Sequence, residues 1–434
     1  MGRKSQTKTL YVFLNQLAVG ELVKSPSGEI SFKYHEDWLE KGFAISQSLP
    51  LQEQMFRGEV VSRYFDNLLP DNDDIKQIVA QKFGAESTRA FDMLEVIGKD
   101  CVGALSFLNQ PSTEFSSFDM DYTPIDNAEI ARRLRGLGSS TPLGMDEDFF
   151  RISLAGAQEK TAFLNIEGKW YEPHGLTPTT HIFKSPIGAL GEEINFSDSV
   201  DNEWASLRIL GKFGLNVCEA KIEVFEDQRV LVVKRFDRIW RQYQGKDILI
   251  RRPQEDLCQA LGHSPYRKYQ NQGGPGIEEI SKLLRASINK EDRVNFFKAI
   301  IVFDLLYATD GHAKNFSLFM SDQGFKLTPF YDVMSGYFLH AREKRPLQKL
   351  KLAMKVGESG HYDFKRIKRR HYLETAKRCG ISEGKFYELL EDLHELYKNL
   401  RFTEAEIDPL LDKASLDMIL SGMEHRAKLI FNND

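Results

Sequence analysis

The chain has 434 residues, of which 41% are hydrophobic and 28% are charged, so it is long enough and apolar enough for two or three globular domains. A net charge of −5 excludes a molecule that is basic all over, and any surface for nucleic acid or anionic membrane must be local. Four scattered cysteines without a C-x-x-C pair argue against a disulfide framework or a zinc site and favour a cytoplasmic location.

The N-terminal part is expected to be rich in strands. Residues 9–16, 17–24 and 29–36 alternate or run apolar, with turn residues between them, which predicts a small antiparallel sheet. Residues 62–83 then have helical apolar spacing that Pro70 interrupts, and the polar residues 109–125 form a connector. We therefore expect a β-rich subdomain with helices over residues 1–147, in which no motif with obvious chemistry is found.

The sequence pattern becomes rich in predicted strands from about residue 150. Residues 160–173 predict two strands around a Glu-Gly turn, residues 179–186 a third strand, and residues 218–238 a further hairpin. A helix over 197–214 lies between them, with Ser and Asp at its start and Gly214 at its end. Past residue 250 the pattern becomes mostly helical, including 276–287 and the strongly apolar 293–308. A strand-rich lobe over 148–240 and an all-helical lobe over 241–434 are predicted, which makes the chain an α+β protein.

The stretch ATDGHAKNF, residues 308–316, follows this apolar helix. Asp310 on a turn beside Gly311 can orient a hydroxyl and accept its proton, and His312 can position Asp310 or touch a nucleotide. Asn315 offers the neutral oxygen that suits Mg²⁺ in a phosphate site. The step of five from Asp to Asn is also that of the protein-kinase catalytic loop. The alternative is a simple Asp-Gly turn followed by a loop cap.

Three further residues are candidates for the same site. Asp332 follows a predicted strand, turn and strand, where a kinase places a second acid to hold the metal that bridges the phosphates. Lys184 closes an apolar strand, where a cation usually needs a partner or a ligand. Glu203, nineteen residues later, is a candidate partner, although support of the helix dipole is the more ordinary role of a first-turn glutamate. For Asp332 and Lys184 the alternatives are an ordinary strand end and surface display.

Two segments could contact the rest of a nucleotide. The stretch ISLAGAQEKT, residues 152–161, is not a standard glycine-rich loop, but its small residues let backbone amides approach an anion, and Lys160 can reach phosphate oxygens. The stretch VVKRFDR, residues 232–238, would offer backbone groups to adenine, Phe236 as an apolar wall and Asp237 to ribose. An ordinary turn and an exposed strand end are the alternatives.

Together these segments resemble HipA, the serine/threonine protein kinase toxin family of bacterial HipBA toxin–antitoxin modules. The segments are FRISLAGAQEKTAFL, TTHIFKSP, SVDNE, VKRFDR, PQEDLCQALG, GGPGI, ATDGHAKNFS and LTPFYD. The resemblance runs over essentially the whole chain and is strongest over residues 148–335. The D-x-H-x-x-N pattern is shared with phosphoinositide kinases and aminoglycoside phosphotransferases, whereas the AGAQEK run is typical of HipA-like proteins.

The resemblance implies a bilobal, eukaryotic-kinase-like fold that uses ATP and Mg²⁺. It makes Asp310 the catalytic aspartate with His312 beside it, and Asn315 and Asp332 the metal ligands. Residues 154–160 become the phosphate loop, and Lys234 to Phe236 the hinge. The ATP-binding residues are then Ala155, Gly156, Ala157, Gln158, Lys160, Lys184, Lys234, Phe236 and Asp237. Ser153 corresponds to the serine that autophosphorylates in the family, and a phosphate there would repel those of ATP.

The resemblance also implies partners. The family binds operator DNA together with its helix-turn-helix antitoxin, HipB. Here a basic run can neutralise DNA phosphates without choosing bases, although a solvated face is the simpler explanation. It consists of Lys365, Arg366, Lys368, Arg369 and Arg370. The implied acceptor is glutamyl-tRNA synthetase, phosphorylated by a growth-arresting toxin.

Two other functions stay open at this stage. They are a small-molecule phosphotransferase of the aminoglycoside-kinase kind and a catalytically silent co-repressor. No apolar stretch approaches the roughly 18 residues of a membrane span, so no membrane partner is expected.

Overall fold

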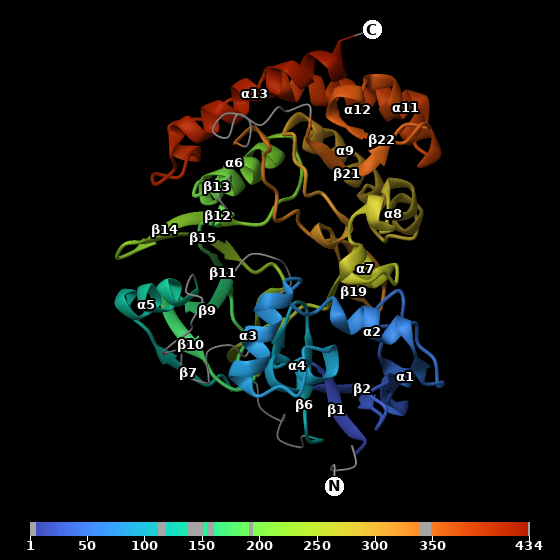
Figure 1. Cartoon of the computed structure of the whole chain (residues 1–434), viewed down its shortest axis with the longest axis vertical. Helices are drawn as coiled ribbons and strands as arrows, with labels where there is room; N and C mark the ends of the chain where they lie inside the picture. Colours follow the sequence, from blue (N-terminus) through green and yellow to red (C-terminus); the bar gives the residue numbers. More distant parts are fainter. Residues whose placement is uncertain are drawn as a thin grey trace.

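The computed structural model describes residues 6–111, 119–137, 152–153, 160–190, 194–338 and 349–432. Figure 1 shows the N-terminal part and the C-terminal helices at opposite ends of the long axis, with a sheet between them on one side. Three hydrophobic clusters hold the described residues together: one within residues 10–107, one within 130–232 and one within 200–431.

The N-terminal part is built on an antiparallel sheet with strand order β4-β3-β2-β1-β6. Its strands are β1 (Lys8–Leu14), β2 (Leu17–Lys24), β3 (Ile30–Tyr34), β4 (Phe56–Arg57) and β6 (Leu105–Leu108). The other elements are α1 (Glu36–Lys41), α2 (Glu59–Asp66), α3 (Asp73–Phe83), α4 (Ala90–Ile97) and β5 (Asp100–Cys101). The predicted sheet is confirmed. The predicted helical pattern with a break at Pro70 is also confirmed. Helix α2 ends before Pro70 and α3 begins after it, where the side chain of Asn72 caps the new helix.

A second sheet has the order β14-β15-β11-β9-β10-β7. Its strands are β7 (Tyr122–Pro124), β9 (Lys160–Ile166), β10 (Lys169–Pro173), β11 (His181–Lys184), β14 (Ala220–Phe225) and β15 (Gln228–Lys234). Side chains of β15 alternate between the two faces: Val230 and Val232 join the cluster of α5 (Asn127–Leu137), whereas Leu231 and Val233 join that of α6 (Ser199–Lys212). The two helices therefore cover opposite faces, as Figure 1 shows. Lys184 lies at the end of β11, next to α6.

The C-terminal part packs around α9 (Asp292–Leu305), whose residues are apolar and buried on nearly every side, as in a core helix. Around it lie α7 (Leu257–Ala260), α8 (Ile277–Leu284), α11 (Arg369–Arg378), α12 (Glu383–Lys398) and α13 (Lys413–Phe431). Arg426 of α13 and Asp304 of α9 are both fully buried and form a double hydrogen bond, with Nε–Oδ1 at 2.7 Å and Nη2–Oδ2 at 2.5 Å. This pair fixes the last helix to the centre of the core.

The α+β class is confirmed, but residues 241–434 are not all helical. They contain β17 (Lys246–Arg251), β18 (Gln254–Asp256), β19 (Ser317–Ser321), β20 (Gly324–Leu327), β21 (Lys351–Val356) and β22 (His361–Asp363). Strand β17 pairs with β16 (Arg238–Tyr243), and β18 forms a sheet with β19 and β20. The remaining short strands are β8 (Ile152–Ser153), β12 (Gly188–Leu190) and β13 (Ile194–Phe196). Most of these strands are short, and several find their partners far along the chain.

Glu255 of β18 joins the C-terminal part to the N-terminal part. It is fully buried, its Oε2 lies 2.5 Å from Ser46 Oγ, and its Oε1 accepts a hydrogen bond from the backbone nitrogen of Gln47. Burial raises the pKa of Glu255 to about 8, so the carboxyl group is mostly protonated at neutral pH.

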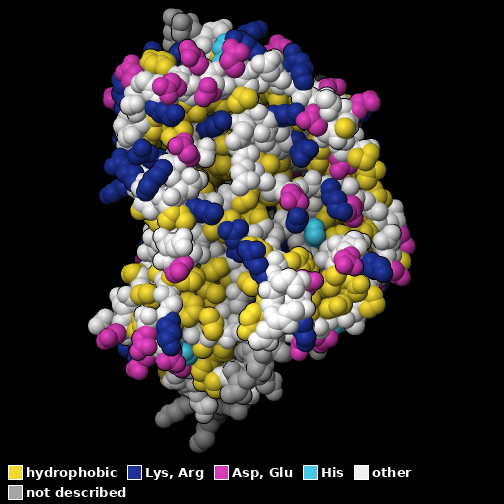
Figure 2. Space-filling model, turned by 180° about the vertical axis from the view of Figure 1, so that it is seen from behind, with side chains coloured by type: hydrophobic (Ala, Val, Ile, Leu, Met, Phe, Trp, Pro, Cys, Tyr) yellow, Lys and Arg dark blue, Asp and Glu magenta, His cyan; other side chains and the backbone are white. Residues whose placement is uncertain are grey.

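Other expectations can be checked over the described residues. All four cysteines are buried and free, and none of the described helices is long and apolar enough to cross a membrane. Figure 2 shows acidic and basic side chains interspersed on the face seen from behind, with basic side chains gathered only in local groups. The domain boundaries at residues 147 and 240 stay predictions.

Candidate functional site

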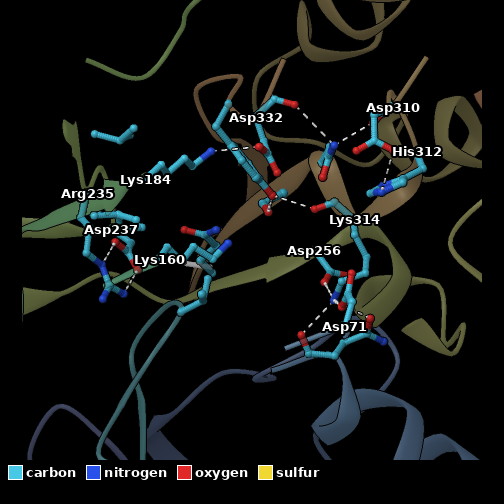
Figure 3. Close-up of a pocket in the computed structure, with 18 of the residues that line it drawn as sticks. Asp71, Lys160, Lys184, Arg235, Asp237, Asp256, Asp310, His312, Lys314 and Asp332 are labelled. Atoms are coloured by element: carbon cyan, nitrogen blue, oxygen red, sulfur yellow. Dashed lines mark hydrogen bonds and ion pairs between the residues drawn. The ribbon is translucent and has the colours of Figure 1, made fainter. Parts of the chain in front are cut away.

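A cavity of ≈ 410 Å³ opens where the second sheet, the C-terminal core and the N-terminal part meet. This volume lies within the range of small-molecule sites. Its wall includes Lys160 and Lys184 from the sheet, Asp310 and Asp332 from the C-terminal part, and Asp71 from the N-terminal part (Figure 3). Side chains from all three parts of the chain therefore face the same space.

Lys184 joins the sheet to the helical core. Its Nζ lies 2.6 Å from Glu203 Oε1 and 2.9 Å from Asp332 Oδ1, and its side chain is only 9% exposed. Although burial opposes its charge, Asp332 and Glu203 hold the pKa of Lys184 well above its ordinary value. The pairing with Glu203 that the sequence suggested is confirmed. The alternative role of Glu203, support of the helix dipole, is secondary to this buried ion pair.

Lys160 lies directly opposite Lys184 across the β9–β11 pair. Like charges in opposed positions of a sheet destabilise each other. Burial lowers the pKa of Lys160 to about 8, with Asp332 opposing the shift and Lys184 adding to it. Two neighbouring lysines that face one cavity form an environment that an anionic ligand would stabilise.

Asp332 is held in an unusual backbone conformation. Its φ is 57°, in the left-handed region that residues other than glycine seldom adopt and that is often found at functional sites. Burial would raise the pKa of its carboxyl group, but Lys184 and Lys160 together hold that pKa far below its ordinary value. Asp332 is therefore ionised and shares Lys184 with Glu203, which leaves carboxylate oxygen available to a metal ion.

Asn315 ties the two acidic loops together. Its Nδ2 donates to the backbone oxygen of Asp310 at 2.7 Å and to that of Asp332 at 3.5 Å. Because both partners are acceptors, the amide nitrogen must point at them, and this fixes Oδ1 as the atom on the other side of the amide group. The neutral oxygen that the sequence assigned to a metal ion is thus oriented by the loops themselves.

Asp310 and His312 lie beside each other in the wall of the cavity. His312 Nε2 is 3.4 Å from Asp310 Oδ1, and the phenol of Tyr269 donates a hydrogen bond to the same carboxylate oxygen. Burial lowers the pKa of His312 although Asp310 opposes the shift, so the imidazole is neutral at pH 7. Asp310 is 40% exposed, so a hydroxyl from another molecule can reach the carboxylate that the Tyr269 phenol contacts.

The predicted hinge also borders the cavity. Phe236 packs against Tyr331, with ring centroids 5.6 Å apart, as an apolar wall. The Lys234 side chain forms an exposed ion pair with Glu219 at 2.9 Å, and the Lys234 backbone nitrogen donates to the backbone oxygen of Glu219 at 2.9 Å.

Asp237 has a more constrained place than the sequence suggested. Its carboxylate accepts hydrogen bonds from Arg235, from Arg238 and from the backbone nitrogen of Gly103. A ribose hydroxyl would have to compete with these partners. The ribose role stays a prediction, and the observed contacts give Asp237 a structural one.

Several predicted positions lie outside the described residues. They are Ala155, Gly156, Ala157 and Gln158 of the proposed phosphate loop. Only the backbone of Ser153 is described, in β8, which pairs in parallel with β5 through Cys101. The loop and its serine stay predictions.

The basic run lies away from the cavity, at and before the start of α11. Lys365, Lys368 and Arg370 are exposed, Arg366 makes a long ion pair with Asp363 at 3.7 Å, and the guanidinium group of Arg369 lies over the ring of Tyr387. The exposed side chains of the basic run are accessible to a large anionic partner. Their role in DNA contact stays a prediction.

Sequence reasoning missed two groups of cavity residues. The first is Gln254, whose buried Oε1 has no hydrogen-bond partner within the described part of the chain. The second is a charged cluster of Asp71, Asp256, Lys268 and Lys314. Lys314 lies inside the ATDGHAKNF stretch, and Gln254 and Asp256 lie inside the PQEDLCQALG segment. Neither pattern indicates the contacts that these residues make, because their partners are up to 247 residues away.

The fold and site define an α+β protein whose central cleft brings two sheet lysines to an acid and an amide of the helical part. A family model described as the HipA-like C-terminal domain matches residues 152–400, and one described as the HipA N-terminal domain matches residues 10–108. Protein Y4mE of Sinorhizobium fredii is 30% identical over 436 residues, which cover 98% of each chain. The chain therefore belongs to the HipA-like family.

Two Shewanella oneidensis comparisons extend this result. The serine/threonine-protein kinase toxin HipA of that organism is 28% identical over 352 residues, which cover 76% of each chain. A solved structure of HipA with HipB and operator DNA matches with a TM-score of 0.74 and 22% identity, over 97% of each chain. The second match shows that the fold is shared over nearly the whole length.

Proposed function

We propose that this protein is an ATP- and Mg²⁺-dependent serine/threonine protein kinase and the toxin of a type II toxin–antitoxin module. The observation that carries the proposal is the cleft in which Lys160 and Lys184 face Asp332, with Asn315 beside it. Paired lysines suit phosphate oxygens, and a carboxylate with an amide oxygen suits Mg²⁺. The similarity to the serine/threonine-protein kinase toxin HipA of Shewanella oneidensis supports the same activity.

The residues fit a magnesium-bound nucleotide, which would supply the phosphoryl group. Lys160 and Lys184 would bind phosphate oxygens, and Asn315 Oδ1 and Asp332 would hold the metal ion. Gln254 Oε1, which has no hydrogen-bond partner among the described residues, would accept from a donor group such as the adenine amine. Backbone groups of the hinge would complete the base site.

Asp310 would act on the acceptor. Its carboxylate would orient the serine or threonine hydroxyl and accept its proton, as its hydrogen bond with the Tyr269 phenol illustrates. His312 is neutral and lies 3.4 Å away, so it would orient Asp310 rather than add charge to the site.

The cellular role follows by resemblance. The acceptor would be glutamyl-tRNA synthetase in the cytoplasm, and its phosphorylation would arrest growth. Autophosphorylation of Ser153 would place a charge of about −1.5 to −2 beside the phosphate site and exclude ATP. A HipB-like antitoxin and operator DNA are proposed partners, in line with the assembly named in the structural relative, with the basic run at residues 365–370 as a phosphate contact.

The test is transfer of labelled phosphate from ATP, with and without Mg²⁺, by the wild type and by Asp310→Asn. We expect label on protein acceptors only with Mg²⁺ and the wild-type chain, with purified glutamyl-tRNA synthetase as the first acceptor tried. Label on metabolites alone would replace the proposal with a small-molecule phosphotransferase. No transfer, with normal operator binding alongside antitoxin, would make the chain a silent co-repressor.

The Ser153 part has its own test. A sample that is fully phosphorylated at Ser153 should lose ATP binding in a calorimetric titration, whereas Ser153→Ala should keep it. Equal ATP affinity of the phosphorylated and unphosphorylated chains would remove autophosphorylation as the means of inactivation.

A further inference from the structure

A cluster of charged side chains lies next to the catalytic loop. Asp71 Oδ2 is 2.8 Å from Lys268 Nζ, and Asp71 Oδ1 is 3.6 Å from Lys314 Nζ. Lys314 also lies 3.0 Å from Asp256 Oδ2 and donates to the backbone and side-chain oxygens of Asn67, both at 2.9 Å. Figure 3 shows Asp71 and Asp256 next to Lys314, on the side of the cavity where Asp310 and His312 lie.

The side chains of Asp71 and Lys314 are buried, and that of Lys268 is partly buried. The side chains of Asp71 and Lys314 are 9% and 3% exposed, and that of Lys268 is 18% exposed. Burial opposes a charge on Asp71, but Lys314 and Lys268 hold its pKa below the ordinary value. Buried charges are tolerated only when each has a partner, so the geometry of Asp71 constrains the two lysines.

Each of the two lysines belongs to a segment that holds Asp310. Lys314 stands between His312 and Asn315 in the catalytic loop itself. The backbone oxygen of Lys268 accepts a hydrogen bond from the backbone nitrogen of Ala313, inside the catalytic loop, at 3.4 Å. One carboxylate therefore connects both supports of the proposed catalytic base.

Asp71 comes from outside the segment that carries the other site residues. It lies between α2 and α3, within the stretch of residues 10–108 that matches the HipA N-terminal domain. Tyr266 strengthens this contact, because its hydroxyl accepts from Lys76 at 3.0 Å and donates to Asp73 at 3.1 Å. The N-terminal part thus holds the 265–272 segment at two neighbouring points.

We propose that Asp71 is a positioning residue for phosphotransfer, through which the N-terminal part holds Asp310 in its working position by way of Lys268 and Lys314. The inference rests on the proposed function. The ion pairs of Asp71 are made with Lys268 and Lys314, and its charge is only a lesser influence on the pKa of Lys160, so its loss should affect the transfer step more than nucleotide binding. Supports of this kind change rates by about 10- to 100-fold when they are removed.

The experiment compares kcat and the Mg·ATP dissociation constant of the wild type, Asp71→Asn and Asp74→Asn. Asp74 is a matched control, because it is an exposed acid in the first turn of α3, three residues after Asp71. For Asp71→Asn we expect kcat to fall by about 10- to 100-fold, with an ATP dissociation constant within about 3-fold of the wild-type value. Asp74→Asn should match the wild type in both.

Two further measurements separate positioning from general destabilisation. Hydrogen exchange of Asp71→Asn should increase in residues 265–274 and 308–316 while the β9–β11 sheet stays protected. The double variant Asp71→Asn/Lys268→Met should be no slower than the slower of the two single variants, because both changes break the same support.

Three outcomes would overturn the inference. Wild-type kcat in Asp71→Asn would show that the carboxylate holds nothing that matters for transfer. A parallel loss of kcat, ATP affinity and melting temperature would reduce Asp71 to a structural role. If the wild-type chain itself transfers no phosphate, the proposed function fails and the inference falls with it, whereas an active wild type with a fully active Asp71→Asn refutes the inference alone.

Discussion

Substitution of Lys184 by methionine removes the cation that Glu203 and Asp332 share. The Glu203 side chain is only 3% exposed, and burial raises its pKa even against the pull of Lys184. Without Lys184 this carboxyl group is left without its partner in the core. Loss of one member of a buried ion pair costs about 3–5 kcal/mol. Asp332 keeps the nearby charge of Lys160, so we expect the free energy of unfolding of Lys184→Met to fall by about 3 kcal/mol.

A second variant separates this structural effect from ligand binding. Lys184→Met/Glu203→Gln carries no orphaned charge on α6, so it should recover most of the lost stability in urea unfolding. Its affinity for Mg·ATP in a calorimetric titration should stay at least about 10-fold below that of the wild type, because the phosphate-binding cation is still missing. Recovery of ATP affinity together with stability would refute the assignment of Lys184 to the phosphates. Unchanged stability of Lys184→Met would refute the claim that the buried ion pair of Lys184 with Glu203 stabilises the fold.

Three other changes test separate parts of the molecule. Glu255 keeps its proton up to about pH 8 when folded and loses it near pH 4.5 when unfolded, so wild-type stability should fall by at most about 5 kcal/mol as pH rises through this window. Glu255→Gln should be flatter over the same pH series of urea unfolding curves, and parallel curves would contradict the assignment. Tyr269→Phe should lower the KM for the acceptor protein by about 2- to 10-fold, because the phenol no longer competes for Asp310; an unchanged or higher KM in steady-state phosphotransfer would rule this out. Arg426→Met leaves Asp304 without its partner and should cost about 3–5 kcal/mol in urea unfolding, with a loss below about 1 kcal/mol counting against the pair.

Much of the fold could be predicted because its signals are local. The hairpin β14–β15 follows from alternating apolar residues around a turn, and α9 from an apolar run of helical length. The pairing of Lys184 with Glu203 also has a local origin, since one closes a strand and the other lies on the next described helix. The proximity of Asp310 and Asn315 could also be predicted, because both residues belong to one short loop.

The parts that could not be predicted depend on contacts between distant segments. The strand, turn and strand predicted before Asp332 are confirmed as the hairpin β19–β20. Its pairing with β18, which joins Gln254 to Phe319, had no local signal, because β18 is short and far away in the sequence, and the lobe as a whole was expected to be helical. The hairpin β16–β17 did have a signal, an alternating pattern around Gln244 and Gly245. Nothing in the sequence near Asp71 indicates that its carboxylate meets Lys314.

The contacts of Asp237 are another example of what the sequence could not predict. Its place after the predicted hinge suggested contact with ribose, but its oxygens are taken by Arg235, Arg238 and the backbone of Gly103. Gly103 belongs to the N-terminal part, so only the tertiary structure reveals the competition. The motif thus predicted that Asp237 lies at the cavity, but not which groups its carboxylate binds.

The most direct test of the central claim is a crystal structure with a non-hydrolysable ATP analogue and Mn²⁺, whose anomalous scattering locates the metal ion. We predict an anomalous peak within coordination distance of Asn315 Oδ1 and an Asp332 oxygen, with the phosphates against Lys160 and Lys184. A nucleotide bound elsewhere, or a metal ion away from both ligands, would contradict the account.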